Sequence, residues 1–306
     1  MDDMIHGILN VYKEKGYTSH DVVAKLRGIT GQRKIGHTGT LDPDAEGVLP
    51  VCLGRGTKLC DLLTDRDKTY ETVLLLGRVT DTQDISGTVL KSQDISGISE
   101  ESVRAAIAGF VGGYEQIPPM YSALKVNGKK LYELAREGIE VERRARAVKI
   151  YGIDFISMEL PRVKLRVQCS KGTYIRTLCH DIGMKLGCGG CMEELTRTRA
   201  GQFTLETSLT LSEIALRKQE GRLMDAVIPV DAVFEDYPRL TVRKDWEKTA
   251  KNGNPLPGKA FAGMDGADHC RGNVRIYDES GQFLSVSRWR EERDEYHIIK
   301  MFYVPQ

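Results

Sequence analysis

The sequence lacks any apolar stretch approaching the roughly 18 residues that a membrane-spanning helix requires. It also lacks the basic end of a secretory signal, because two aspartates follow Met1. These two absences argue against membrane-spanning and secreted proteins. We therefore expect a cytoplasmic protein with no membrane partner.

The sequence has neither a disulfide framework nor a nucleotide-binding loop. Its seven cysteines are an odd number spread along the chain, which is typical of reduced thiols. Cys188 and Cys191 form one CxxC pair, whereas a structural zinc site usually needs two such pairs, so we expect no metal. The string GRGTK at residues 54–58 lacks the Gly-Lys-Ser/Thr order of a phosphate loop, and no dinucleotide fingerprint occurs. We therefore expect no nucleotide or other cofactor.

The composition is that of a folded protein with a large core. Of the 306 residues 41% are hydrophobic, and 44 Lys and Arg face 43 Asp and Glu, which gives a net charge of +1. The length favours one large domain plus a small one. The near-zero charge conceals two basic zones. Residues 125–149 hold eight basic and four acidic side chains, and residues 162–199 show a similar excess. Local patches of this kind can bind nucleic acid.

Hydrophobic periodicity predicts the main helices and strands. Apolar residues at helical spacing follow Thr18 and Ser99, both of which can cap a helix, and recur over residues 175–186. In the helix expected after Ser99 these residues are Val103, Ile107, Phe110 and Val111. Residues 162–169 alternate strictly between apolar and basic or polar side chains, which predicts a half-buried strand with a basic outer face. Residues 69–76 are rich in Val, Leu, Tyr and Thr and predict another strand. Beyond about residue 225, prolines and three short apolar runs predict a second, mostly β domain.

The densest polar signal lies in a glycine-rich segment, residues 34–51, which we expect to be an ordered loop rather than a helix. Within it, GHTGTLDP at residues 36–43 carries one carboxylate, Asp42. The glycines allow close backbone approach to a ligand, and Pro43 stiffens the chain. A carboxylate held by rigid backbone can act as a nucleophile or a base. The residues alone leave a second interpretation open, in which Asp42 only caps a turn.

Several motifs occur together and in one order. They are GHTGTLDP followed by GVLPVCLG, KTY at residues 68–70, DTQDISG at 81–87, IPPMYSALK at 117–125 and CSKGTYIR at 169–176. Together they resemble the signature of the TruB-type tRNA pseudouridine synthases, which isomerise uridine 55 in the T-arm of tRNA. The resemblance covers roughly residues 7–203. Joint occurrence favours it far more strongly than any single motif does.

The resemblance implies a catalytic set of Asp42, Arg176 and Tyr70. Asp42 would attack the uridine or its sugar while the glycosidic bond is broken and remade through carbon. Arg176 would pair with Asp42 and keep it ionised. The implied substrate-binding side chains are Tyr70 stacked on the target base, Tyr174 lining the pocket, Leu195 as an apolar wall and His37 holding the RNA with its nucleotide turned out. Taken singly, Tyr70 also fits a core position and Arg176 an ordinary helix start.

The implied fold is of the α+β class. It comprises a pseudouridine synthase catalytic domain over residues 1–230, with a mixed, mainly antiparallel sheet, and a small β-rich PUA-like RNA-binding domain over residues 231–306. The second domain matches the family less specifically. One departure lies near the start, where Glu14 stands at a position that the family usually gives to proline.

Residues 120–146 resemble the insertion with which the family grips the RNA arm. The basic side chains expected to meet phosphates there are Lys125, Lys129, Lys130, Arg143, Arg144 and Arg146. The expected partner is therefore the T-arm of tRNA. The chain has no coiled-coil heptads, which favours a monomer.

Two alternative functions stay open at this point. One is a non-catalytic RNA-binding protein that kept the fold, against which the intact Asp42, Tyr70 and Arg176 argue. The other is a pseudouridine synthase that acts on another RNA, such as ribosomal RNA. The continuous insertion over residues 120–146 favours the tRNA T-arm over other RNAs.

Overall fold

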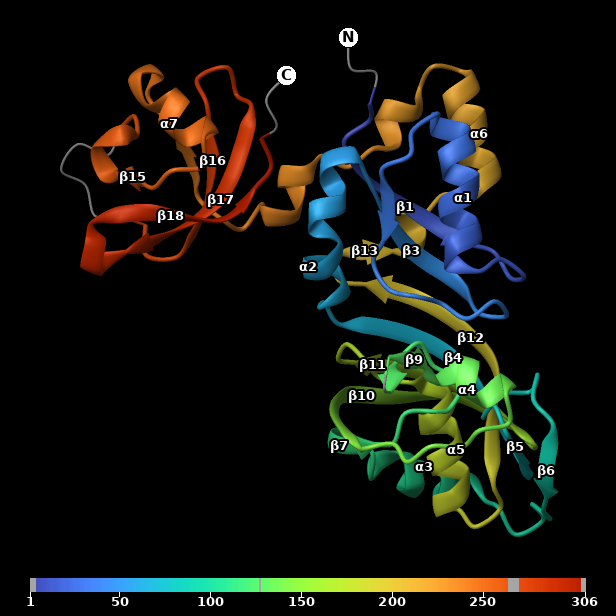
Figure 1. Cartoon of the computed structure of the whole chain (residues 1–306). Helices are drawn as coiled ribbons and strands as arrows, with labels where there is room; N and C mark the ends of the chain where they lie inside the picture. Colours follow the sequence, from blue (N-terminus) through green and yellow to red (C-terminus); the bar gives the residue numbers. More distant parts are fainter. Residues whose placement is uncertain (1–3, 127, 264–269, 304–306) are drawn as a thin grey trace. The chain divides into compact units, whose positions relative to one another are not determined.

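The computed structural model describes residues 4–126, 128–263 and 270–303, and the chain forms two compact units (Figure 1). The larger unit comprises Asn10–Val51 and Cys60–Gly221, and the smaller unit comprises Met1–Leu9, Cys52–Leu59 and Arg222–Gln306. Among the described residues, no helix combines the length and the apolar character that crossing a membrane requires. The sequence analysis divides the chain at residue 230 into a catalytic and an RNA-binding domain, and this functional division stays a prediction.

A mixed sheet of nine strands forms the framework of the larger unit. Its main path runs in the order β1 (Gly7–Lys13), β3 (Glu46–Leu53), β12 (Gly190–Ala200), β4 (Lys68–Leu76), β11 (Arg162–Cys169), β10 (Arg146–Glu159) and β7 (Gly112–Gln116). Off this path, β2 (Ile35–His37) pairs with β3, and β13 (Phe203–Thr204) pairs with β12. The pairs from β12 to β7 are antiparallel, whereas β12 and β3 are parallel. The predicted α+β class with a mixed, mainly antiparallel sheet is confirmed.

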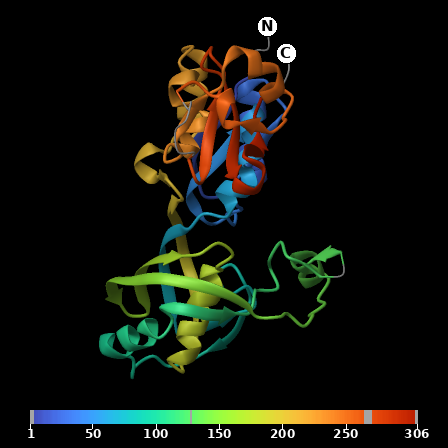
Figure 2. The same ribbon diagram turned by 90° about the vertical axis from the view of Figure 1, so that its left-hand side faces the viewer.

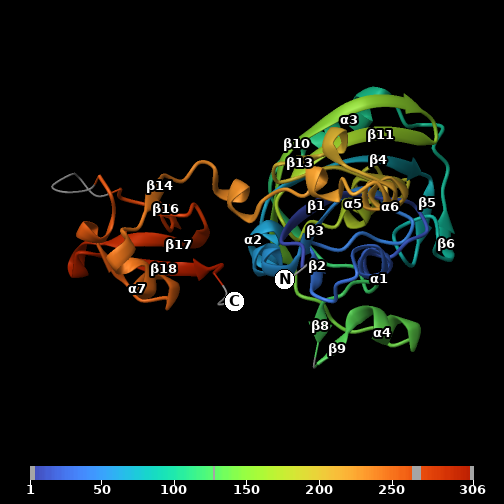
Figure 3. The ribbon, with the colours of Figure 1, turned by 90° about the horizontal axis from the view of Figure 1, so that it is seen from above.

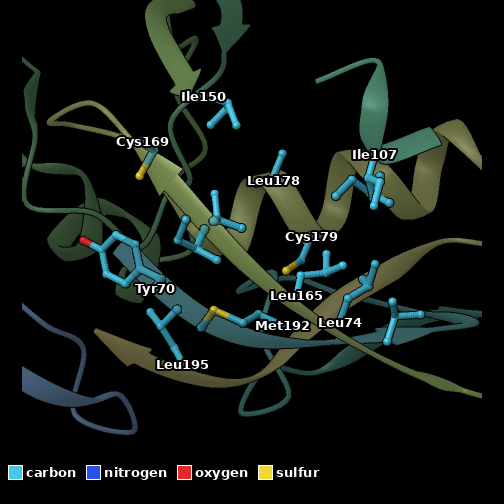
Figure 4. Close-up of a cluster of buried hydrophobic side chains, with 14 of the residues drawn as sticks. Tyr70, Leu74, Ile107, Ile150, Leu165, Cys169, Leu178, Cys179, Met192 and Leu195 are labelled. Carbon is cyan, nitrogen blue, oxygen red and sulfur yellow. The ribbon is translucent and has the colours of Figure 1, made fainter. Parts of the chain in front are cut away.

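The main core of the larger unit lies between helices and the strands β4, β10, β11 and β12. Helix α5 (Ile175–Lys185) contributes Leu178 and Cys179, and helix α3 (Glu100–Ala108) contributes Ile107. Figure 4 shows the Cys179 side chain next to Leu165 of the sheet, and all these residues belong to one buried cluster. The apolar residues of β11 are all fully buried and alternate with exposed ones, as the sequence predicts. Full burial of each such side chain stabilises the fold by about 1.5–3 kcal/mol.

Helix α1 (Ser19–Thr30) forms where the sequence predicts it. The Thr18 hydroxyl accepts a hydrogen bond from the Asp21 N–H, and the Asp21 carboxylate accepts one from the Thr18 N–H, so both satisfy donors that a helix start leaves unpaired. Gly31, with φ of 74°, ends the helix in the left-handed conformation. The remaining helices of the larger unit are α2 (Cys60–Thr64), α4 (Leu131–Arg136) and α6 (Leu211–Gln219).

Two expectations need correction. Residues 34–51 are not one loop, because β2 and most of β3 lie within them. The apolar run from Val48 to Leu53 is buried, as in a strand covered on both faces, and the prolines and glycines of this segment obscured that pattern. Helix α3 also ends earlier than predicted, so Phe110 and Val111 lie beyond it; Gly109 closes its last turn.

The basic outer face of β11 is present, but its three cations are paired with two carboxylates. Arg162 contacts Glu193 at 2.6 Å, and Arg166 contacts Glu71 at 2.8 Å. The Lys164 ammonium also lies 3.6 Å from the Glu71 carboxylate. These acidic partners come from β12 and β4, which lie next to each other in the sheet. The second basic zone is therefore largely an ion-paired surface rather than a free cationic one.

The insertion at residues 120–146 projects from the sheet of the larger unit (Figures 2 and 3). It contains the short strands β8 (Lys125–Val126) and β9 (Lys129–Lys130) followed by α4. A cluster of its own, formed by Met120, Leu131 and Leu134, stabilises it. A second hairpin in the larger unit pairs β5 (Arg78–Thr80) with β6 (Val89–Ser92).

The smaller unit contains a five-stranded sheet, as the apolar runs beyond residue 225 predict. Its order is β14 (Arg239–Thr241), β16 (Asn273–Tyr277), β17 (Phe283–Arg290), β18 (Glu295–Met301) and β15 (Leu256–Pro257). The short helix α7 (Glu247–Lys251) accompanies it. Phe261, Leu284 and Tyr296 are central members of its core.

Candidate active site

Asp42 lies in the short loop that joins β2 to β3. The backbone of this loop is held from several sides: the Thr38 N–H donates to the Pro50 carbonyl at 3.1 Å, and the Leu41 N–H donates to the Ser19 hydroxyl at 2.9 Å. Leu41 packs into the core, and Gly39 has a φ of 110°, which other residues rarely adopt. The carboxylate is thus presented by fixed backbone, and its side chain is 40% exposed.

Arg176 pairs with Asp42, as the sequence suggests. Its Nε lies 3.0 Å from one carboxylate oxygen and its Nη2 lies 3.4 Å from the other, so the contact is bidentate. Arg176 is the second residue of α5, and its side chain is only 7% exposed. A buried cation therefore orients a carboxylate that solvent and a ligand can still reach.

Asp84 is a second carboxylate at this site, and the sequence analysis did not assign it a role. Its Oδ2 lies 3.5 Å from the Nη1 of Arg176. The same guanidinium donates to the carbonyls of Thr82 at 3.3 Å and Tyr121 at 3.0 Å. Arg176 thus joins the Asp42 loop, the turn at residues 81–87 and the base of the insertion. The sequence contained a signal for this role, because Asp84 belongs to the DTQDISG motif at residues 81–87.

The pKa of the Asp42 carboxyl is raised from its ordinary value of 3.8. Burial is the main cause, the negative charge of Asp84 acts in the same direction, and the Arg176 guanidinium opposes both. Arg176 thus favours the ionised carboxylate, as expected. The pKa of Asp42 is nevertheless raised, because the effect of burial is larger than that of Arg176.

Lys13 also supports the loop, and the sequence analysis did not single it out. It is fully buried at the end of β1. Its ammonium donates to the carbonyls of Tyr17 at 2.6 Å, Pro43 at 3.1 Å and Glu14 at 3.2 Å. Burial lowers the pKa of Lys13 to about 8, which the nearby Asp42 and Asp44 partly counteract. The available signal was a lysine at the end of a largely apolar strand.

Tyr70 and Leu195 lie side by side at one end of the main core (Figure 4). Both are buried, with 9% and 8% of their surface exposed. Burial raises the pKa of the Tyr70 hydroxyl, and the positive charge of the nearby Arg197 opposes this rise. The Tyr70 ring is thus part of an apolar wall. This position fits a core residue, and it also fits a stacking surface that becomes accessible only when a ligand displaces its neighbours.

Tyr174 precedes α5 and is clamped by a buried amide. The Gln116 side chain accepts from the Tyr174 N–H at 2.7 Å and donates to the Tyr174 carbonyl at 3.0 Å. Burial raises the pKa of the Tyr174 hydroxyl. His37 lies at the other side of the loop, with its ring 5.4 Å from that of His20. Burial and the charges of His20 and Arg197 lower the pKa of His37, so its imidazole is neutral at physiological pH.

Both the sequence and the fold of this chain are similar to those of known proteins. Residues 27–175 match the N-terminal domain of the TruB family pseudouridylate synthases, and residues 176–235 match the C-terminal domain of tRNA pseudouridylate synthase B. The tRNA pseudouridine synthase B of Lachnoclostridium phytofermentans is 50% identical over 97% of this chain and 100% of its own length. That of Clostridium tetani is 42% identical over 97% of this chain and 99% of its own length. The chain belongs to the TruB family of pseudouridylate synthases.

Solved structures agree with the TruB family assignment. A Cbf5–Nop10–Gar1 complex contains a chain that matches with a TM-score of 0.72 and 28% identity, over 97% of this chain and 85% of that one. An H/ACA ribonucleoprotein bound to a substrate RNA contains another, with a TM-score of 0.71 and 26% identity, over 98% of this chain and 86% of that one. The overall fold of this chain is thus shared with these proteins.

In this TruB family member the six predicted RNA-binding cations differ in their surroundings. Lys125, Arg144 and Arg146 are exposed. Lys129 is paired with Glu137 at 3.5 Å, and Lys130 donates to the Tyr132 hydroxyl at 3.1 Å. Arg143 is turned inward, where it donates to the Pro118 carbonyl at 3.2 Å and contacts Glu140 at 3.1 Å. Arg143 thus braces the insertion itself.

A metal site was not expected near Cys188 and Cys191. Both thiols are buried, and burial raises their pKa values, to about 11 for Cys191, which disfavours the thiolate that binds zinc. Across residues 4–126, 128–263 and 270–303, no three His, Cys, Asp or Glu side chains are grouped so that they could hold an ion.

Proposed function

We propose that this protein is a tRNA pseudouridine synthase that isomerises uridine 55 in the T-arm. The observation that carries this proposal is the half-exposed Asp42 carboxylate, oriented by the buried Arg176 inside a TruB family fold. The names of the relatives, tRNA pseudouridine synthase B, support tRNA as the substrate.

In the proposed reaction Asp42 attacks either the uracil ring or the ribose, and the bond between N1 and the sugar C1′ breaks. The freed base turns, C5 bonds to C1′, and the bond to Asp42 breaks, which regenerates the carboxylate. The hydrogen at C5 leaves as a proton, and N1 takes up a proton. The product is an isomer of the substrate, so the step needs neither an oxidant nor a reductant. Arg176 holds the carboxylate in the orientation for attack.

The target base of a folded RNA arm must leave its stack before Asp42 can reach it. In the proposal Tyr70 stacks on the extruded base, Tyr174 and Leu195 line its pocket, and His37 holds the RNA backbone around the gap. A neutral His37 can donate or accept a hydrogen bond there. The insertion at residues 120–146 contacts phosphates, and residues 231–306 act as a PUA-like RNA-binding domain.

The test is tritium release from tRNA transcripts carrying 5-tritiated uridine. We expect the release of one equivalent of tritium per tRNA. Replacing uridine 55 by cytidine should abolish this release. Binding without release would favour the non-catalytic RNA-binding protein. Release that survives the uridine 55 replacement, or that occurs only with ribosomal RNA fragments, would favour a synthase with another target.

The raised pKa of Asp42 predicts an acid limit to activity. Attack needs the ionised carboxylate, so the rate falls as the pH decreases through a pKa above 3.8. Replacing Asp84 by Asn removes a nearby negative charge, so the limit should move to lower pH. Single-turnover rates between pH 4 and 8, with circular dichroism to verify folding, check this. If the rate of the Asp84→Asn variant falls at the same pH as that of the unaltered protein, the prediction is wrong.

The exposed cations of the insertion predict a salt-dependent contact with RNA. Replacing Arg144 and Arg146 by Gln should weaken tRNA binding and reduce the slope of log K against log salt by about 2. Arg162→Gln is the control, because its guanidinium is already paired with Glu193 on the surface. An unchanged affinity and slope in the double variant would remove these residues from the interface.

A further inference from the structure

Arg197 is a fully buried cation at the junction of three strands. It lies on β12, where its backbone pairs with Tyr70 of β4 on one side and with Gly47 of β3 on the other. Only 1% of its surface is exposed. Gly47 has a φ of 105°, and a Cβ there would lie 2.3 Å from the Arg197 carbonyl oxygen. The close approach of β3 to Arg197 therefore requires this glycine.

The guanidinium of Arg197 bridges the two ends of the Asp42 loop. Its Nε donates to the Val48 carbonyl at 2.7 Å, and its Nη2 donates to the Gly39 carbonyl at 3.3 Å. Gly39 precedes Asp42 and Val48 follows it. Tyr70 is the cross-strand partner of Arg197, and its hydroxyl lies close enough to the Arg197 side chain for the guanidinium to oppose the rise in the Tyr70 pKa. The Arg197 side chain thus connects the Asp42 loop with Tyr70, the proposed stacking ring.

The bonding pattern of Arg197 is unusual for a buried arginine. Burying a cation is costly unless it is paired, and carboxylates are the usual partners. Within the described parts of the chain Arg197 forms no ion pair, and backbone carbonyls take that place. An apolar side chain of similar volume could fill the space without this cost. What only the arginine provides is the fixed planar fork that spans separate acceptors.

We propose that Arg197 is a positioning residue for the isomerisation, which sets the Asp42 loop and the Tyr70 ring in one geometry. This inference rests on the proposed function. Arg197 touches none of the reacting atoms and acts through Gly39, Val48 and Tyr70. Without it, the loop and the ring are free to move independently of each other, so the chemical step slows while the RNA-binding surface stays unchanged.

The experiment uses the full chain with Arg197→Met and Arg197→Lys. Single-turnover pseudouridine formation on T-arm RNA should be about 100-fold slower for Arg197→Met. Arg197→Lys should recover part of the rate, because one ammonium can reach only some of the acceptors. The RNA dissociation constant should stay within about threefold for both variants, since no phosphate contact is lost.

Arg199→Met is the matched control. Arg199 lies on the same strand but donates to the Thr69 hydroxyl at 3.1 Å and the Gly201 carbonyl at 3.0 Å rather than to the Asp42 loop. Its single-turnover rate should stay within about threefold of the unaltered protein.

Two results would overturn the inference. One is an unchanged single-turnover rate in a folded Arg197→Met protein, and the other is a loss that lies entirely in RNA affinity. If Arg197→Met fails to fold, Arg197→Lys decides in the same way: a native melting temperature with a slower rate supports the inference, and an unchanged rate overturns it. An unaltered protein that forms no pseudouridine on any RNA would instead refute the proposed function.

Discussion

Replacing Asp42 by asparagine is expected to abolish tritium release while leaving RNA binding intact. The amide has the shape of the carboxylate but cannot attack as a nucleophile, so the rate should fall by at least about 10⁴-fold. Arg176 keeps its contacts with Asp84 and with the carbonyls of Thr82 and Tyr121, which should preserve the fold. Tritium release and filter binding on the same T-arm RNA separate the two effects.

Asp44→Asn provides the control for Asp42→Asn. Asp44 lies two residues further along the same loop and is exposed. The same chemical change there should leave tritium release close to that of the unaltered protein. Equal losses in both variants would indicate general damage to the loop, and full activity of Asp42→Asn would remove Asp42 from the reaction.

Replacing Arg176 by methionine should have the second largest effect, on both rate and stability. The change removes the cation that faces two carboxylates and leaves two carbonyls without their donor. We expect the single-turnover rate to fall by about 10³-fold, because Asp42 loses its orientation. We expect the free energy of unfolding to fall by about 2–3 kcal/mol, which is less than for a fully buried pair because Asp42 is 40% exposed.

Arg176→Lys distinguishes charge from geometry. Lysine restores the positive charge but not the planar fork that contacts Asp42 through two nitrogens, so it should recover stability more than rate. Urea unfolding and single-turnover kinetics give the two quantities. Arg162→Met is the control, because its exposed contact with Glu193 should contribute less than about 1 kcal/mol. Full activity of either Arg176 variant would contradict the assigned role.

The sequence by itself determined the parts of this protein that depend on local chemistry. The Thr18 and Ser99 caps and the alternation along β11 are short-range features, and each predicts a definite element. The catalytic interpretation of Asp42 came from the motif order and a single loop. Arg176 was predicted beside Asp42 from resemblance, although 134 positions separate them in the chain.

The tertiary structure alone decided which distant groups share the site and how they are charged. β3 was obscured because prolines and glycines suit a loop locally, while burial against β12 favours a strand. Asp84, Lys13 and Arg197 reach the Asp42 loop from separate elements, and no local pattern encodes such a meeting. The direction of the Asp42 pKa also depends on the fold, because desolvation and Arg176 oppose each other and only the packed structure sets their balance.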